Sequence, residues 1–89
     1  MAGINEDLWE FPMEHNFKIM GAAHHPLIDI VIEVVKKHAP QFDETRISVK
    51  SSRTGKYDSI TAVVWIEDKA QLENIYREFS EREEISWTL

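Results

Sequence analysis

The sequence predicts an α+β domain of the ferredoxin-like type, a βαββαβ sandwich whose four-stranded antiparallel sheet has the order 4-1-3-2. Apolar residues alternate with period two in four segments, and they recur at helical spacing in two others. One helical segment separates the first strand from the second, and the other separates the third from the fourth. Right-handed crossovers and short connections favour placing both helices on one face of that sheet.

The first strand and the first helix are predicted over residues 14–22 and 26–38. Phe17 and Ile19 point to one face of the strand, while the polar and flexible side chains between them point to the other. Pro26 suits the first position of a helix. The helix ends before Pro40, because the residue that precedes a proline avoids the helical region.

Residues 46–53 and 57–66 are predicted to form a β-hairpin. Thr54 and Gly55 lie between the two alternating segments and are typical of a turn. The longer arm has two faces. Its core-facing set is Ile60, Ala62, Val64 and Ile66, and its outer set is Tyr57, Ser59, Thr61, Val63 and Trp65.

The second helix is predicted over residues 68–80, and a fourth strand ends the chain. Asp68 followed by Gln71 three residues later is typical of a helix start. One face of this helix carries Leu72, Ile75, Tyr76 and Phe79, and the last strand carries Ile85, Trp87 and Leu89 at period two. We expect both helices to rest on Phe17, Ile19, Ile47, Val49, Ile60, Ala62, Val64 and Ile66.

The composition describes one small acidic domain. Its 89 residues suffice for a single domain, which we expect over residues 11–89 behind a flexible lead-in over residues 1–10. With no cysteine there is no disulfide framework and no thiolate chemistry, which fits a cytoplasmic location. We expect neither a signal peptide nor a membrane-spanning run, because residues 1–10 carry three carboxylates and no apolar run. The net charge of −6 argues against a nucleic-acid partner.

Several short motifs are shared with a known family. They are Phe11-Pro12, Lys18-Ile19-Met20-Gly21, Val34-Val35, His38-Ala39-Pro40, and Ser51-Ser52 followed by Gly55-Lys56-Tyr57 and Ser59. On these motifs the chain resembles, over residues 11–89, the YbeD-like family of small uncharacterised bacterial proteins. It departs from the family pattern in a hairpin tip that is one residue longer, and in the ending Ser86-Trp87-Thr88-Leu89, where members typically close with Met-Val-Leu.

The resemblance implies a fold and little else. It implies the same ferredoxin-like fold, similar to small regulatory ACT-type domains. It brings no activity, cofactor or catalytic residue. Labels on some members suggest a link to lipoate metabolism, and that link is implied by the resemblance alone.

The residues do not assemble into a catalytic or metal site. Ser51 and Ser52 lack a nearby histidine and a nucleophile-elbow sequence. Of the histidines, His24 and His25 are adjacent and are expected to point apart, and His38 follows a whole helix later. We therefore expect no enzyme activity, no metal and no other cofactor.

The hairpin is the candidate site for a small anionic ligand. Its hydroxyls, turn amides and basic side chains could together hold a carboxylate or phosphate. The candidate residues are Ser51, Ser52, Arg53, Lys56 and Tyr57. The alternative is ordinary turn chemistry, because serine, threonine and glycine are favoured in turns and basic residues protect edge strands.

The open face of the sheet is the candidate interface. Val63 and Trp65, with Met20 of the first strand, are predicted to lie on the face that the helices leave bare. The helix over residues 26–38 also has an apolar arc of roughly 200°, about twice what packing on a sheet requires. Leu8, Trp9 and Phe11 could cover the excess, or another protein could do so.

The leading functional hypothesis is therefore a protein-interaction or regulatory module without catalytic activity. It would act through the open sheet face or a sheet edge, as a homodimer or with another protein. The alternative is a small-molecule sensor that binds an anionic metabolite near the basic hairpin.

Overall fold

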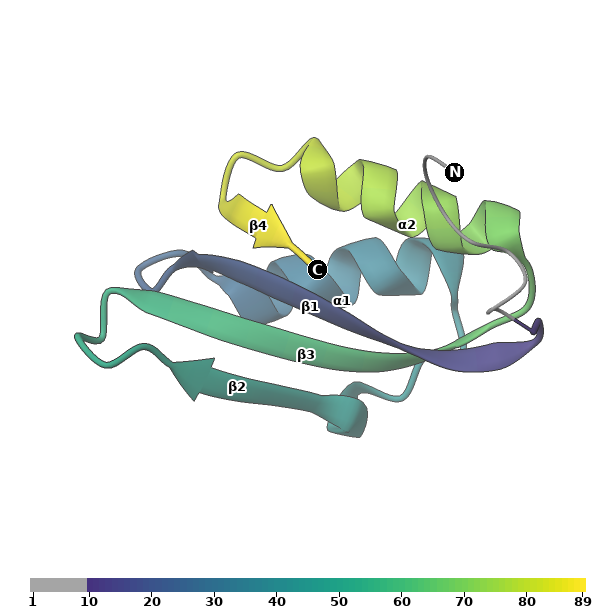
Figure 1. Ribbon diagram of the computed structural model, residues 1–89, viewed down its shortest axis with the longest axis horizontal. Coiled ribbons are helices and arrows are strands. Elements are labelled where there is room, and N and C mark those ends of the chain that lie inside the picture. The colour runs from purple at the N-terminus through teal and green to yellow at the C-terminus, as the bar shows by residue number, and fades with distance from the viewer. Residues whose placement is uncertain (1–9) are drawn as a thin grey trace.

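The strand order and the helix positions follow the predicted pattern in the computed structural model, which describes residues 10–89 (Figure 1). The elements are β1 (Met13–Ala22), α1 (Leu27–His38), the short 3₁₀ turn η2 (Glu44–Arg46), β2 (Ile47–Ser51), β3 (Tyr57–Ile66), α2 (Lys69–Ser80) and β4 (Ile85–Thr88). The strands are antiparallel in the order β2-β3-β1-β4, which confirms the predicted fold. The predicted lead-in lies, apart from Glu10, outside the described residues.

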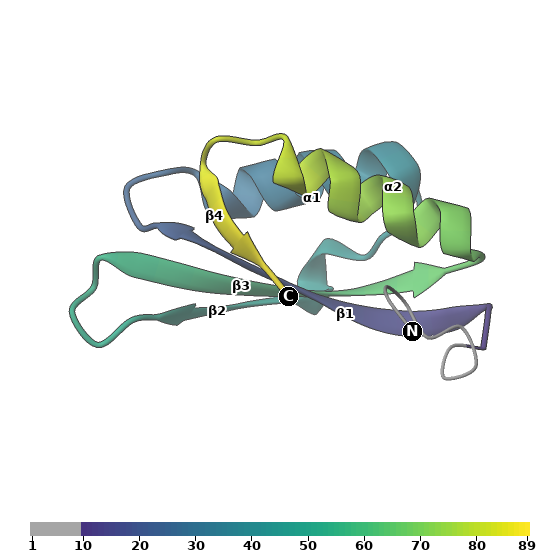
Figure 2. The ribbon, with the colours of Figure 1, turned by 45° about the horizontal axis from the view of Figure 1, so that its top comes forward.

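Both helices lie on one face of the sheet (Figure 2). The Asp68 carboxylate accepts a hydrogen bond from the Gln71 backbone N–H at 2.8 Å, as a helix cap does, and α2 begins at the next residue. Between helices and sheet lies the core, formed by Phe17, Ile19, Leu27, Ile30, Val31, Val34, Val35, Ala39, Phe42, Ile60, Ala62, Val64, Ile66, Leu72, Ile75 and Phe79. No helix within residues 10–89 combines the length and apolarity needed to cross a membrane.

The helices cover β2, the outermost strand, only in part, because Ile47 packs against the core and Val49 does not. α1 packs on β3, and α2 packs on β4 and β3. Val49 is 45% exposed and Ile47 is half-buried. The expectation that the helices rest on Val49 is therefore wrong, because that side chain points to the helix side of the sheet but lies beyond the cover that α1 provides.

A β-bulge divides the apolar residues of β4 between the two faces. Ile85 lies opposite Gly21, whereas Trp87 lies opposite Met20, so β4 contains one extra residue between them. Ile85 packs against the core, and Trp87 is instead 55% exposed on the outer face. The single period-two face predicted for β4 is therefore wrong.

A half-buried histidine couples the fold to pH. The His15 Nε2 atom lies 2.7 Å from the Tyr76 hydroxyl oxygen. Burial lowers the pKa of His15 and raises the pKa of Tyr76. Because the unfolded chain binds a proton on His15 more readily than the folded chain does, protonation favours unfolding.

We expect the free energy of unfolding to fall as the pH drops below about 6.5, the ordinary pKa of histidine. The contribution of neutral His15 to the free energy of unfolding is present in full above that pH. It is lost as the pH falls toward the lower pKa that His15 has in the folded protein. Urea unfolding at a series of pH values measures the effect. His15→Gln, which keeps a hydrogen-bonding side chain without a titrating group, should show a smaller loss between pH 7.5 and 5.5. Equal losses in both proteins would contradict the assignment.

Candidate functional site

The outer face of the sheet, opposite the helices, carries the residues predicted to form an interface. Val63 and Trp65 lie together near the end of β3, and Trp65 is 55% exposed. Met20 lies opposite Trp87, whereas Val63 lies opposite Asn16. Asn16 and Met20 are four positions apart along β1, a distance of about 13 Å. The structure therefore groups Val63 with Trp65 and places Met20 elsewhere on the face.

A second pair of aromatic residues lies at the other end of this face, with Trp87 opposite Met20. The rings of Tyr57 and Trp87 meet edge to face with centroids 5.9 Å apart. Leu89 lies on the same face, opposite Lys18, and is largely exposed. Sequence reasoning missed Trp87 as an outer-face residue, because only the bulge in β4 turns it away from the core side.

Two hydroxyl groups of the hairpin form hydrogen bonds within the hairpin itself. The Ser52 hydroxyl accepts a hydrogen bond from the Tyr57 backbone N–H at 3.1 Å, and the Ser51 hydroxyl donates one to the Asp58 carboxylate at 3.0 Å. Arg53 and Lys56 are exposed at the tip. The structure thus brings the predicted anion-site residues into one turn, with two of the hydroxyls engaged and a carboxylate beside them.

The end of β3 forms a bare sheet edge. β2 pairs with β3 only as far as Ile47 opposite Ala62, because the chain turns away at Glu44–Arg46. The Tyr57 carbonyl accepts a backbone hydrogen bond from the β2 side. Since backbone groups alternate along an antiparallel strand, those of Trp65 also point to that side. No strand within residues 10–89 pairs with Trp65 there.

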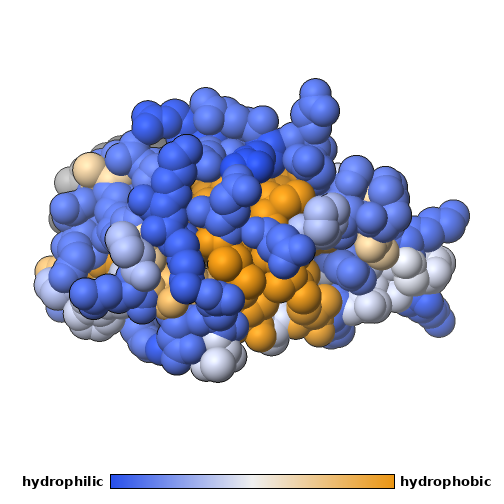
Figure 3. Space-filling view, turned by 180° about the vertical axis from the view of Figure 1, so that it is seen from behind, coloured by the Kyte–Doolittle hydropathy of each residue, from blue (hydrophilic) through white to orange (hydrophobic). Residues whose placement is uncertain are grey.

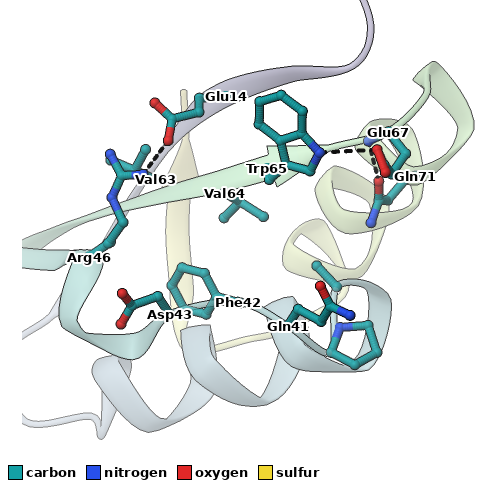
Figure 4. Close-up of a pocket in the computed structure, with 12 residues that line it drawn as sticks. Glu14, Gln41, Phe42, Asp43, Arg46, Val63, Val64, Trp65, Glu67 and Gln71 are labelled. Carbon is teal, nitrogen blue, oxygen red and sulfur yellow. Dashed lines mark hydrogen bonds and ion pairs between the residues drawn. The ribbon is translucent and has the colours of Figure 1, made fainter.

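A pocket of about 490 Å³ opens at this bare edge, and we call it the edge pocket (Figure 4). Pro40 and Phe42, from the loop after α1, form its apolar floor with Val64 of β3. Figure 4 shows Val64 directed to the Phe42 side of the strand and Trp65 directed to the opposite side. The edge pocket therefore follows the strand edge, with an apolar side chain on either side of it. Its polar lining is Glu14, Gln41, Asp43, Arg46, Glu67 and Gln71.

Hydrogen bonds hold the pocket rim in place. The Trp65 indole N–H donates to the Glu67 carboxylate at 3.1 Å, and the Glu67 backbone N–H donates to the Gln71 side-chain oxygen at 2.7 Å. Arg46 forms an ion pair with Glu14 across the sheet. The indole is thus oriented by α2 and the turn before it, which fixes the aromatic side of the pocket.

The rim is acidic overall. Hydrogen bonds from the Thr45 hydroxyl and backbone N–H hold the pKa of Asp43 below its ordinary value, so this carboxylate is charged at neutral pH. Glu14 and Arg46 neutralise each other. Asp43 and Glu67 therefore leave the rim with a net negative charge.

The histidines lie apart from other candidate metal ligands: within residues 10–89, no three histidine, aspartate or glutamate side chains converge on one point. The ring centroids of His24 and His25 lie 4.1 Å apart, so the expectation that they point apart is wrong.

His38 takes part in a cluster of charged residues, in which its Nε2 atom lies 2.9 Å from the Glu78 carboxylate. Burial would raise the pKa of Glu78, but hydrogen bonds from His38, Lys37 and Arg82 outweigh it and lower that pKa.

The structure has a solved counterpart. The solution structure of protein HP0495 from H. pylori superposes with a TM-score of 0.70, covering 100% of this chain and 98% of that one. The sequence identity is 11%, so this likeness concerns the fold alone.

Sequence comparison reaches proteins from several bacteria. A UPF0250 protein of Janthinobacterium sp. is 37% identical over 84 residues, which cover 94% of this chain and 92% of the relative. A UPF0250 protein of Shewanella oneidensis is 39% identical over 80 residues, with 90% and 89% covered. The model of a family described as "Protein of unknown function (DUF493)" matches residues 6–89, and the YbeD-like proteins are that same family. The chain therefore belongs to the DUF493 family, whose members include the UPF0250 proteins.

Proposed function

We propose that the protein is a non-catalytic binding module that takes up an extended segment of a partner protein along the bare edge of β3. One observation carries this proposal. The unpaired end of β3 coincides with the edge pocket and with the exposed ring of Trp65. A sheet edge, a pocket and an aromatic anchor at one place are the parts that recognition by strand addition requires.

Each part has a separate role in such binding. The backbone N–H and C=O of Trp65 pair with the backbone of the added segment, which supplies affinity with little dependence on sequence. Alternate side chains of that segment then point to opposite faces. One contacts Phe42 and Val64 in the pocket, and the next contacts Trp65 on the outer face.

The charge of the rim selects the kind of segment. Asp43 and Glu67 are acidic, and Arg46 is engaged by Glu14. A segment with an apolar residue beside a lysine or arginine complements this rim, whereas an acidic segment is repelled. The bound class is therefore a basic, apolar stretch of extended polypeptide.

The anionic-metabolite alternative stays a prediction. Its candidate hydroxyls on Ser51 and Ser52 already have partners within the hairpin, and Asp58 adds a negative charge beside them. Those contacts are the ones that ordinary turn chemistry requires. The edge pocket is the better-formed site.

Trp65→Glu should weaken peptide binding by about tenfold or more, because a tryptophan anchor typically carries a large share of interface energy. The probe is a 12-residue peptide selected from a random phage-displayed library on the wild-type protein, with affinity measured by fluorescence anisotropy. Trp87→Glu is the matched control, since Trp87 has the same 55% exposure at the other end of the same face. It should leave the affinity unchanged.

Amide hydrogen exchange locates the bound segment. Exchange at the Trp65 amide should slow when the peptide binds, because that N–H gains a backbone acceptor. Selected peptides should be enriched in lysine or arginine. Unchanged exchange at Trp65, or equal loss of affinity in both tryptophan variants, would contradict strand addition at this edge.

A further inference from the structure

Exposed basic side chains gather on the outer face of the sheet and on the adjoining hairpin tip. They are Lys18, Lys50, Arg53 and Lys56. None of them forms an ion pair within residues 10–89, whereas carboxylates pair with Lys36, Lys37, Arg46 and Arg82. The positive charge that the protein leaves without a partner is therefore concentrated away from the helices.

Two of these lysines lie in neighbouring rows of outer-face residues that cross all four strands. In the order β2, β3, β1, β4, the first row is Lys50, Ser59, Met20 and Trp87, and the second is Ser48, Thr61, Lys18 and Leu89. Neither row contains an acidic side chain. Strand spacing and rise place the Cα atoms of Lys18 and Lys50 roughly 12 Å apart. We call these two rows, together with Tyr57, the lysine face.

Two aromatic rings border the lysines on this face. Trp87 is 55% exposed and Tyr57 is 41% exposed, and the two rings meet edge to face. Tyr57 belongs to the same outer set of β3 as Ser59, so this pair lies beside the first row. An exposed aromatic ring next to basic side chains offers a surface on which a planar, anionic ligand can stack.

The negative charge of the chain lies away from the lysine face. Within the four strands, Glu14 is the acidic side chain of the outer face, and it is paired with Arg46. Glu14 and Met20 are six positions apart along β1, a distance of about 20 Å. Asp58 points to the helix side, where it accepts a hydrogen bond from Ser51. The net charge of −6 weakens the approach of any polyanion, but the side chains that such a ligand would meet on this face are basic.

Another exposed apolar area lies over α1, and Figure 3 shows it from behind, bordered by hydrophilic residues. Ile28 of α1 is 42% exposed there although Phe11 packs against the core, and Leu8 and Trp9 lie outside the described residues. Lys36, about two turns after Ile28 on the same flank of the helix, is paired with Glu44. The unpaired lysines therefore distinguish the lysine face from this area.

We propose that the lysine face binds a single strand of nucleic acid. A base stacks on the exposed ring of Trp87, and Lys18 and Lys50 contact separate phosphates of the same strand. An open sheet presents its rings to unpaired bases, whereas the bases of a duplex are stacked on one another. An acidic protein segment would pair with the lysines but would leave the indole without a planar partner. The hairpin tip, with Arg53 and Lys56, extends the basic track.

Fluorescence anisotropy of the full chain with labelled 12-nucleotide strands of one mixed sequence, as RNA and as DNA, tests the proposal. At about 25 mM salt, the single strands should bind at least fivefold more tightly than the matching duplexes. Trp87→Ala should weaken binding by about fivefold or more, because a stacking contact is lost. The tighter of the two strands identifies RNA or DNA as the preferred ligand.

The double variant Lys18→Gln with Lys50→Gln keeps the test valid if Trp87→Ala fails to fold, since both lysines are exposed. It should weaken binding and also reduce the slope of log affinity against log salt by about 1.4, because each phosphate contact on a single strand contributes about 0.7. An unchanged slope would contradict the assigned phosphate contacts.

Trp65→Ala is the matched control, because Trp65 has the same 55% exposure at the other end of the outer face. It should leave nucleic-acid binding unchanged while it weakens binding of the selected peptide, so failure of this proposal and failure of the proposed function are distinguishable. Equal losses in the two tryptophan variants would overturn the proposal, as would no binding at about 100 μM protein, well above a micromolar dissociation constant. A 12-residue polyglutamate peptide that binds as tightly as the RNA would also overturn it, because the occupant would then be an acidic protein segment.

Discussion

Replacing Ile75 with alanine is expected to lower the free energy of unfolding by about 2–5 kcal/mol. Ile75 is fully buried on the core face of α2, so its removal loses apolar contacts and leaves a cavity. Val34→Ala, at an equally buried position of α1, should fall at the lower end of that range, because fewer atoms are removed.

Urea unfolding followed by circular dichroism measures both changes. Ile28→Ala is the matched control, an isoleucine of α1 that is 42% exposed, and it should cost less than about 1 kcal/mol. Low protein concentration keeps association from contributing to the measured stability. A loss for Ile75→Ala no larger than that for Ile28→Ala would contradict the described core.

Gly21→Ala is expected to destabilise the fold by about 1–3 kcal/mol, because there is no room for a side chain at this position. A Cβ atom on Gly21 would lie 2.4 Å from the Glu84 carbonyl oxygen and 2.8 Å from a methyl carbon of Leu27. The first contact is with the backbone of the residue immediately before β4, which can yield only if the strand pairing shifts.

Gly55→Ala provides the comparison for Gly21→Ala in the same unfolding experiment. Gly55 has a φ of 75° and nothing within 4 Å of the position a Cβ would take. Its alanine variant should cost about 1 kcal/mol, from backbone conformation alone. The two variants therefore separate steric crowding from backbone strain. A larger loss at Gly55 than at Gly21 would contradict the close packing around Gly21.

The architecture could be predicted because local patterns and the fold agree. Alternation along β3 places Ile60 and Val64 in the core, as expected, and the Asp68 cap marks the start of α2. These features depend on neighbours in the sequence, which fix side-chain direction and helix ends. The exposure of Trp65 could be predicted for the same reason, since it follows directly from the alternation in β3.

The remaining features depend on tertiary structure. The bulge that exposes Trp87 is a mismatch between β4 and β1, and neither strand shows it alone. Val49 is exposed because α1 does not extend over it. The alternation of residues within β2 does not indicate where α1 lies. The bare edge of β3 depends on the register of β2 on β3, in which Ile47 lies opposite Ala62, and neither strand shows that register alone.

The position of β1 at the centre of the sheet also determines when the protein can fold during its synthesis. β1 is made early, yet its two neighbours, β3 and β4, both follow later in the chain. While the ribosome is adding residues 23–56, β1 can gain no neighbouring strand, so α1 has no sheet on which to bury its apolar flank. The first ladder that includes β1 forms only as residues 57–66 emerge, and it joins positions far apart in the sequence, which makes folding late and slow relative to a helical domain of this size.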